Sequence, residues 1–204
     1  MSPSRSTSPI PIPTPRTSQL TPCPLPPPST FFHDHWKTSL VGHSDSNASQ
    51  DRAHLRVTYA NNHWLNVGSR APSVRFGTAH VYNNFYQNLS TAVNTRMGAE
   101  VVAESNAFRN VKEPITSADS KEVGTAVTRD NDLGGATVKA PAGTFGIASV
   151  IPYKYTLLGS GAVPGRVPGE AGAILTFAPA GGNETRPVMM PHVRRMRTGR
   201  AKLW

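Results

Sequence analysis

The chain has 204 residues, a length that suits one domain of ordinary size or two small ones. Hydrophobic residues make up 37% of it, so a packed core can form, although part of the chain is expected to stay unstructured. No apolar run approaches the ~18 residues of a transmembrane helix, which excludes a membrane span. A single cysteine, Cys23, excludes an intramolecular disulfide framework and a cysteine-based zinc site.

The formal net charge of +9 is concentrated near the two ends of the chain. The central part, residues 31–177, is nearly balanced, with 13 basic and 11 acidic side chains. A nucleic-acid-binding domain carries its positive charge on the folded part, so no specific nucleic-acid binding is expected.

Both ends of the chain are predicted to be disordered. Residues 1–30 contain 10 prolines, 6 serines and 5 threonines, a composition that buries too little apolar surface to offset its ordering entropy. Prolines also interrupt any apolar run there, so this leader does not read as a secretory signal. Residues 178–204 form a second, basic tail.

The central part contains an internal repeat with a step of 22 residues. The segments VTYANNHWLNV (57–67), AHVYNNFYQNL (79–89) and VVAESNAFRNV (101–111) align without gaps. Four columns keep one register, two of asparagine, one aromatic and one aliphatic: Asn62, Asn84 and Asn106; Asn66, Asn88 and Asn110; Trp64, Tyr86 and Phe108; Val67, Leu89 and Val111. A weaker copy at 125–135 places Asn131 after a three-residue insertion, and FFHDH at 31–35 reads as an earlier, incomplete copy.

This repeat predicts an all-β parallel β-helix. Each copy shows short alternating patterns rich in β-branched and aromatic residues, and no segment sustains a helical period. Each coil is expected to contain about three short strands, with equivalent asparagine amides hydrogen-bonding along the stack. The alternative is an ordinary β-sandwich in which the matches arise by chance. Residues 141–177 depart from the repeat, with strand-like pieces at Ser149–Tyr155 and Ala173–Phe177, and are expected to wrap or cap the last coil.

Three cations stand out against this fold. Lys37 precedes Arg70 by one coil plus a loop excursion at 44–54, so coil stacking is expected to place the two side by side on one flank. Arg75 follows Arg70 across Pro72, which stiffens the turn between them. Clustered cations on a β-surface suggest an acidic ligand, and planar guanidinium groups suit carboxylates. The alternative is that both arginines are solvated surface residues.

The same region also holds several histidines and aspartates that invite a metal assignment. They are better read as polar loop residues, because their spacing fits no zinc pattern: His33, Asp34, His35, His43 and Asp45.

The segment HDHWKTSLVGHSDSN (33–47), the R-x-P-x-x-R pattern of Arg70, Pro72 and Arg75, and the repeated coils together resemble the large bacterial and fungal family of pectate lyases. The similarity runs from Phe31 to Phe177, is nearest to the fungal members, and includes YKYTLLGSGAV (153–163) and AGAILTF (171–177). It implies a right-handed parallel β-helix and an extracellular, monomeric lyase that degrades pectin by calcium-dependent β-elimination of α-1,4-polygalacturonate. On the matched positions, Arg70 is the catalytic base, while Lys37 and Arg75 bind the substrate carboxylate.

The chain also departs from that family. The family's calcium ligands are acidic residues on coils upstream of the Lys37 segment, and residues 1–33 contain no Asp or Glu. We therefore expect an N-terminally truncated β-helix with no metal ligand assigned in it, and a truncated or misassembled gene product is one alternative that stays open. Asp34, Asp45 and Asp51 are not assigned to calcium. Two alternatives to an active enzyme stay open: an inactive remnant that binds acidic polysaccharide through the three cations, and a non-enzymatic β-solenoid scaffold.

Overall fold

The structure is a computed structural model that describes residues 29–145 and 151–174. The leader predicted to be disordered lies outside the described residues up to residue 28, and so does the basic tail predicted at 178–204. The descriptions that follow concern the described residues alone.

Ten strands and two helices make up the described fold. In chain order they are β1 (Phe31–Lys37), β2 (Leu40–Val41), α1 (Ala48–Asp51), β3 (Arg56–Ala60), β4 (His63–Ser69), β5 (Ser73–Arg75), β6 (Thr78–Tyr82), β7 (Phe85–Arg96), β8 (Glu100–Glu104), β9 (Ala107–Thr116), β10 (Thr125–Arg129) and α3 (Val163–Glu170).

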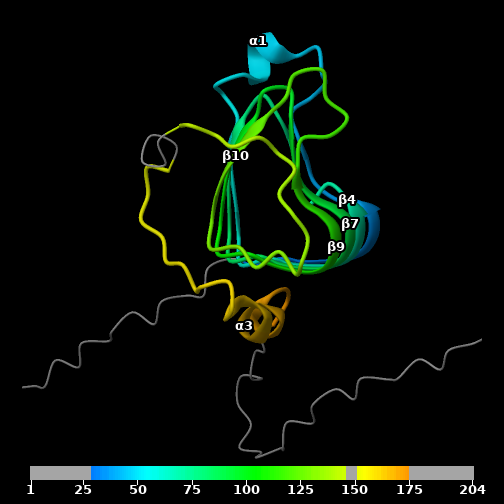
Figure 1. Ribbon diagram of the computed structural model, residues 1–204, viewed down its shortest axis with the longest axis vertical. Helices are drawn as coiled ribbons and strands as arrows, with labels where there is room; N and C mark the ends of the chain where they lie inside the picture. The colour runs from blue at the N-terminus through cyan, green and yellow to red at the C-terminus, as the bar shows by residue number, and fades with distance from the viewer. Residues whose placement is uncertain (1–28, 146–150, 175–204) are drawn as a thin grey trace, which may run out of the picture. The chain divides into compact units, whose positions relative to one another are not determined.

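Every ladder between these strands is parallel. One sheet runs β1-β4-β7, with β9 on the far side of β7, and continues around a bend through β2, β5 and the second half of β7. The other sheet runs β3-β6-β8-β10. Seen end-on, β4, β7 and β9 stack on one side of the coils and β10 lies on the other (Figure 1). The fold is therefore the predicted parallel β-helix, and the β-sandwich alternative is wrong.

The inner asparagine column stacks as the repeat predicts. The backbone N and Nδ2 of Asn62 both donate to Asn84 Oδ1 at 3.0 Å. Asn84 donates in the same way to Asn106, at 2.9 and 3.1 Å. Asn106 donates to Asn131 at 3.1 and 2.9 Å, across a separation of 25 residues that includes the predicted insertion. Because these amides are buried, the ladder both satisfies them and sets the register of the coils.

An aromatic stack fills the core beside this ladder. The ring centroids of Phe32 and Trp64 lie 3.9 Å apart, those of Trp64 and Tyr86 6.0 Å, and those of Tyr86 and Phe108 4.6 Å. Phe32 takes the aromatic position of the incomplete first copy. The step from β1 to β4 is longer than the others, since Phe31 pairs with His63, and the extra residues form the loop that carries α1.

The prediction for residues 141–177 is wrong in its strands, although residues 141–143 do cover the last coil, where Ala142 pairs with Ala126 of β10. Residues 151–155 and 173–174 form no strand, and the remaining parts of the two predicted strands lie outside the described residues. Instead of capping the last coil, α3 packs against the side of the sheet, where Val163 and Val167 are buried with Phe85 and Ala107 (Figure 1). Residues of the 131–143 segment cover the last coil, as shown by the bonds from Lys139 N to Ile115 O and from Gly143 N to Ala126 O.

The helix α3 was not expected because its sequence, VPGRVPGE, is rich in helix breakers. A proline in the first turn is tolerated, since its missing N–H has no intrahelical partner there. The two buried valines lie one turn apart, so contact with the sheet supplies the stability that helix propensity lacks.

The segment that follows residue 150 lies along the outside of the β3-β6-β8 sheet. The Tyr153 hydroxyl lies 2.7 Å from His80 Nδ1 and 2.6 Å from Thr58 Oγ1, and Leu158 N donates to Asn83 Oδ1 at 3.0 Å. His80 is only 3% exposed, and its burial lowers the pKa of the imidazole to about 4. Its Nε2 is buried without a hydrogen-bond partner among the described residues, so a proton there is unfavourable.

Stability is therefore expected to fall as the pH is lowered from 6.5 toward 4. Over that range the unfolded chain binds a proton at this histidine and the folded chain does not, which costs about 3 kcal/mol at most. Urea midpoints of the protein and of His80→Gln, measured at pH 4.5 and 7.5, test this. The variant should lose much of the pH dependence, whereas His54→Gln, at an exposed loop position, should keep it. Equal pH dependence in all three proteins would contradict the assignment.

Candidate functional site

Stacking of the first two coils brings Lys37 and Arg70 together. Lys37, at the end of β1, pairs in register with Ser69 of β4. The carbonyl of Arg70 then accepts two hydrogen bonds from the residues after Lys37, from Thr38 Oγ1 at 2.6 Å and from Ser39 N at 2.7 Å. The two cations therefore lie on neighbouring coils of one flank, as the spacing predicted.

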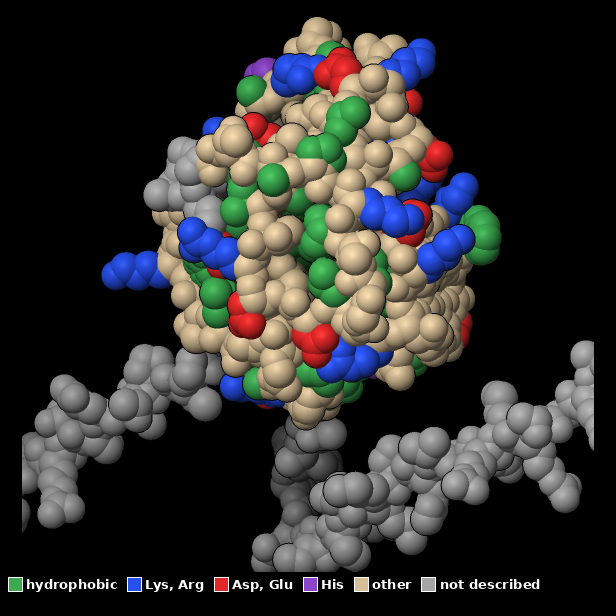
Figure 2. Space-filling model, in the orientation of Figure 1, with side chains coloured by type: hydrophobic (Ala, Val, Ile, Leu, Met, Phe, Trp, Pro, Cys, Tyr) green, Lys and Arg blue, Asp and Glu red, His purple; other side chains and the backbone are tan. Residues whose placement is uncertain are grey.

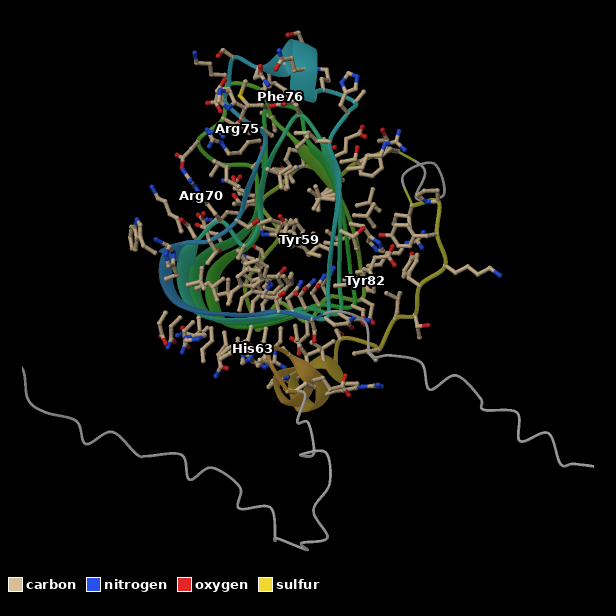
Figure 3. All side chains as sticks on the ribbon, turned by 180° about the vertical axis from the view of Figure 1, so that it is seen from behind. Tyr59, His63, Arg70, Arg75, Phe76 and Tyr82 are labelled. Carbon is tan, nitrogen blue, oxygen red and sulfur yellow. The ribbon has the colours of Figure 1, made fainter. Side chains whose placement is uncertain are left out.

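Both side chains are available to a ligand. Lys37 is exposed and Arg70 is half-buried. Arg70 has a φ of 62° at the turn between β4 and β5. Within residues 29–145 and 151–174, neither side chain makes a hydrogen bond or an ion pair. Figure 3 shows Arg70 and Arg75 on the same outer flank, whereas Tyr59 lies toward the interior of the coils.

Arg75 occupies a different environment from the other two cations. Its side chain is 11% exposed, and Nε donates to Asp45 Oδ1 at 2.5 Å. Arg96, its register partner on β7, donates to Asp45 Oδ2 at 3.1 Å and is 13% exposed. Asp45 thus bridges two largely buried arginines and fixes Arg75 beneath the flank.

Sequence reasoning missed this bridge. Arg96 follows Arg75 by nearly one coil step, which is a signal for stacking, but nothing in the pattern shows that the loop carrying Asp45 folds back over both. The unpaired positive charge of the flank consequently comes from Lys37 and Arg70, with Arg75 already neutralised in part.

The carboxylates and histidines near Lys37 form local hydrogen bonds. Asp34 accepts from Asn66 Nδ2 at 2.8 Å and lies 3.0 Å from His33 Nδ1. Asp51 accepts from His43 N at 2.9 Å. In the part of the chain that the structure describes, no group of three His, Cys, Asp or Glu side chains is placed to hold a metal ion. These residues do not fit a calcium site, which needs several oxygen ligands.

The surface charge is not gathered into one patch on the face shown in Figure 2, where Lys and Arg side chains are interspersed with Asp and Glu. That pattern does not suggest a nucleic-acid surface on this face. No helix among the described residues is long and apolar enough to cross a membrane.

A parallel β-helix that presents unpaired cations on one outer flank is suited to bind an acidic polymer. The family model described as pectate lyase matches residues 28–173 of this chain. The chain therefore belongs to the pectate lyase family.

Relatives agree with this membership. The chain is 55% identical over 150 residues to pectate lyase B of Colletotrichum gloeosporioides, a match that covers 73% of this chain and 44% of that protein. Among solved structures, pectate lyase II from Xanthomonas campestris superposes with a TM-score of 0.64 at 35% identity, covering 71% of this chain and 47% of that one. Pectate lyase C from Erwinia chrysanthemi, solved with 30 mM Ca²⁺, superposes with a TM-score of 0.57 at 29% identity, covering 72% and 48%. The chain spans less than half the length of the curated relatives it matches.

Proposed function

We propose that this protein is a pectate lyase that cleaves polygalacturonate by β-elimination, with Arg70 as the base and Lys37 and Arg75 as carboxylate-binding groups. The observation that carries the proposal is the stacking of Lys37 next to Arg70 on an open flank, in a chain of the pectate lyase family. The relatives bear the name of this activity. The proposal includes that the protein acts outside the cell and as a monomer.

The chemistry of these side chains suits that reaction. A uronate carboxylate held by Lys37 draws electron density from the adjacent α carbon. When Arg70 takes the α proton, the electron pair forms a double bond to the β carbon, and the bond from the β carbon to the glycosidic oxygen breaks. The departing oxygen takes a proton from solvent water. The cations favour this step because negative charge accumulates on the carboxylate as the proton leaves.

Arginine is normally a poor general base at neutral pH, because its guanidinium group stays protonated and has no lone pair free to accept a proton. The proposed step therefore uses the unprotonated form of Arg70. The step therefore requires a substrate proton made more acidic by its surroundings. The fixed positive charge of Lys37 supplies part of that effect, since it stabilises the enolate-like carboxylate more than the ground state. Arg75, held by Asp45, keeps a preorganised guanidinium edge beneath the same flank.

Calcium dependence is part of this proposal, but no step above passes through the ion. The family resemblance implies calcium, whereas residues 29–145 and 151–174 supply no donor set for it.

A lyase assay on polygalacturonate tests the proposal. We expect ultraviolet-absorbing unsaturated products in the presence of calcium, and their loss when a chelator is added. Product formation that persists in the presence of chelator would support the lyase activity and contradict its calcium dependence. Soluble, folded protein that forms no product would overturn the proposal.

A second candidate is a binding protein for acidic polysaccharide without turnover. It is favoured by one observation, the lack of a carboxylate cluster among the described residues in a chain that keeps its cationic flank. Retention on immobilised polygalacturonate, without product, would support it.

A further inference from the structure

Trp36 is the most exposed of the large hydrophobic side chains among the described residues, at 74%. It precedes Lys37 on β1, where it lies beside Gly68 of β4. A Cβ on Gly68 would lie 2.6 Å from the Trp36 carbonyl oxygen and 2.8 Å from Cε3 of the indole. The glycine therefore lets the six-membered ring of the indole rest against β4, which fixes an aromatic surface one residue before Lys37 in the chain.

Trp36 borders an open groove of about 400 Å³ on the outer face of the β1-β4-β7 sheet. The groove extends from β1 across β4 to β7. Its other lining residues are Asp34, His35, Asn66, Val67, Gly68, Asn88 and Ser90. It is thus a shallow surface site that combines one aromatic surface with several hydrogen-bonding groups.

A ladder of exposed side chains orders the polar side of this groove. Asn66 Nδ2 donates to Asp34 Oδ1 at 2.8 Å, and Asn88 Nδ2 donates to Asn66 Oδ1 at 3.0 Å. The three residues have φ values of 50°, 54° and 61°, a left-handed conformation that Asp and Asn tolerate. These side chains are consequently held in fixed positions, each with acceptor capacity left for a hydroxyl group.

The charge of the groove differs from that of the flank beside it. No Lys or Arg lines it, and its one acidic residue is Asp34. Hydrogen bonds from Asn66 and His33 lower the pKa of the Asp34 carboxyl, so this group is ionised at neutral pH. A free uronate carboxylate placed here would meet a like charge, whereas an uncharged sugar would not.

We propose that this groove binds an uncharged pyranose of a pectic chain, a methyl-esterified galacturonate, stacked on Trp36 next to the uronate held by Lys37 and Arg70. The inference rests on the proposed function for the class of polymer only. The aromatic surface accommodates the apolar face of the pyranose, the amide ladder faces its hydroxyl groups, and Asp34 selects against an unesterified residue.

Binding titrations of the full chain test this site. The probes are hexagalacturonate, its partially methyl-esterified form and a neutral galactan hexasaccharide. Isothermal titration calorimetry gives the affinity of every variant, and tryptophan fluorescence in a Trp204→Phe background follows binding to the chain that keeps Trp36. Trp64 is fully buried, so a change on binding reports Trp36. We expect the esterified hexamer to bind most tightly. Trp36→Ala should weaken that binding about threefold to tenfold and leave hexagalacturonate unchanged, while Trp36→Phe keeps most of it.

Two further variants sharpen the test. Asp34→Asn keeps an acceptor for Asn66 but removes the charge, so hexagalacturonate should then bind nearly as well as the esterified form. Leu157→Ala removes an exposed apolar side chain elsewhere, on the 151–158 segment, and should change nothing. Equal affinity for both hexamers, an equal loss on both in Trp36→Ala, or a preference for the galactan would overturn the proposal. These titrations measure binding and not turnover, so they stay informative if the lyase assay fails. If the protein is an active lyase and the Trp36 substitutions do not change the affinity for the esterified hexamer, the proposed groove is overturned and the proposed function is not.

Discussion

Replacing Asn84 by alanine is expected to lower the free energy of unfolding by about 3–5 kcal/mol. Asn84 is fully buried, and its Oδ1 accepts from both the backbone N and Nδ2 of Asn62. Its Nδ2 donates to Tyr59 O, to Tyr82 O and to Asn106 Oδ1. Truncation leaves several of these groups buried without a partner, at about 1–3 kcal/mol each. Urea denaturation followed by circular dichroism measures the loss.

A matched asparagine on the outer ladder provides the control. Asn110 is exposed, donates one hydrogen bond to Asn88 and has a φ of 53°, a conformation that glycine adopts without strain. Asn110→Gly is expected to change the free energy of unfolding by no more than about 0.5 kcal/mol. If both variants lose the same stability, burial of the inner ladder is not what stabilises the coils.

Replacing Arg70 by alanine is expected to reduce lyase turnover by about a thousandfold or more while leaving the thermal midpoint nearly unchanged. The side chain makes no hydrogen bond or ion pair with any described residue, so its loss costs little stability. Its backbone carbonyl, which the alanine retains, is the group that accepts from Thr38 and Ser39. Product formation on polygalacturonate, followed by ultraviolet absorbance, gives the rate.

Two companion variants separate the possible roles of Arg70. Arg70→Lys keeps the positive charge but loses the planar guanidinium, so it should retain substrate binding while losing most of the turnover. Arg129→Ala removes an exposed arginine from β10, on the other sheet, and should leave the rate unchanged. Full activity in Arg70→Ala would show that another group is the base. If the unsubstituted protein forms no product and Arg70→Ala binds polygalacturonate more weakly, the non-catalytic binding function is favoured.

The coil architecture was predictable because the same physical requirement recurs at each step along the chain. A buried asparagine must pair with its equivalent on the next coil, and an aromatic ring must stack on the next ring, so both requirements appear in the sequence at the coil spacing. The same regularity predicted an incomplete copy at 31–35, the insertion before Asn131 and the adjacency of Lys37 and Arg70.

The non-repeating parts were not predictable in the same way. Nothing in the sequence near Asp45 indicates that it bridges Arg75 and Arg96, which are 30 and 51 residues away. The helix α3 contradicts its own propensities and depends on burial of its valines beside Phe85. The groove at Trp36 exists because Gly68, one coil later, has no side chain.

The sequence by itself determined the β-helix, its coil step, its family resemblance and two neighbouring cations, because each of these follows from residues that repeat or stack at a constant interval. Only the tertiary structure decided that Arg75 is neutralised from a loop, that the segment after residue 150 lies along the sheet through Tyr153 and His80, and that Trp36 borders an open groove over β1, β4 and β7. These features depend on where irregular loops return to the coils. That return is governed by packing between distant residues and leaves no periodic trace in the chain.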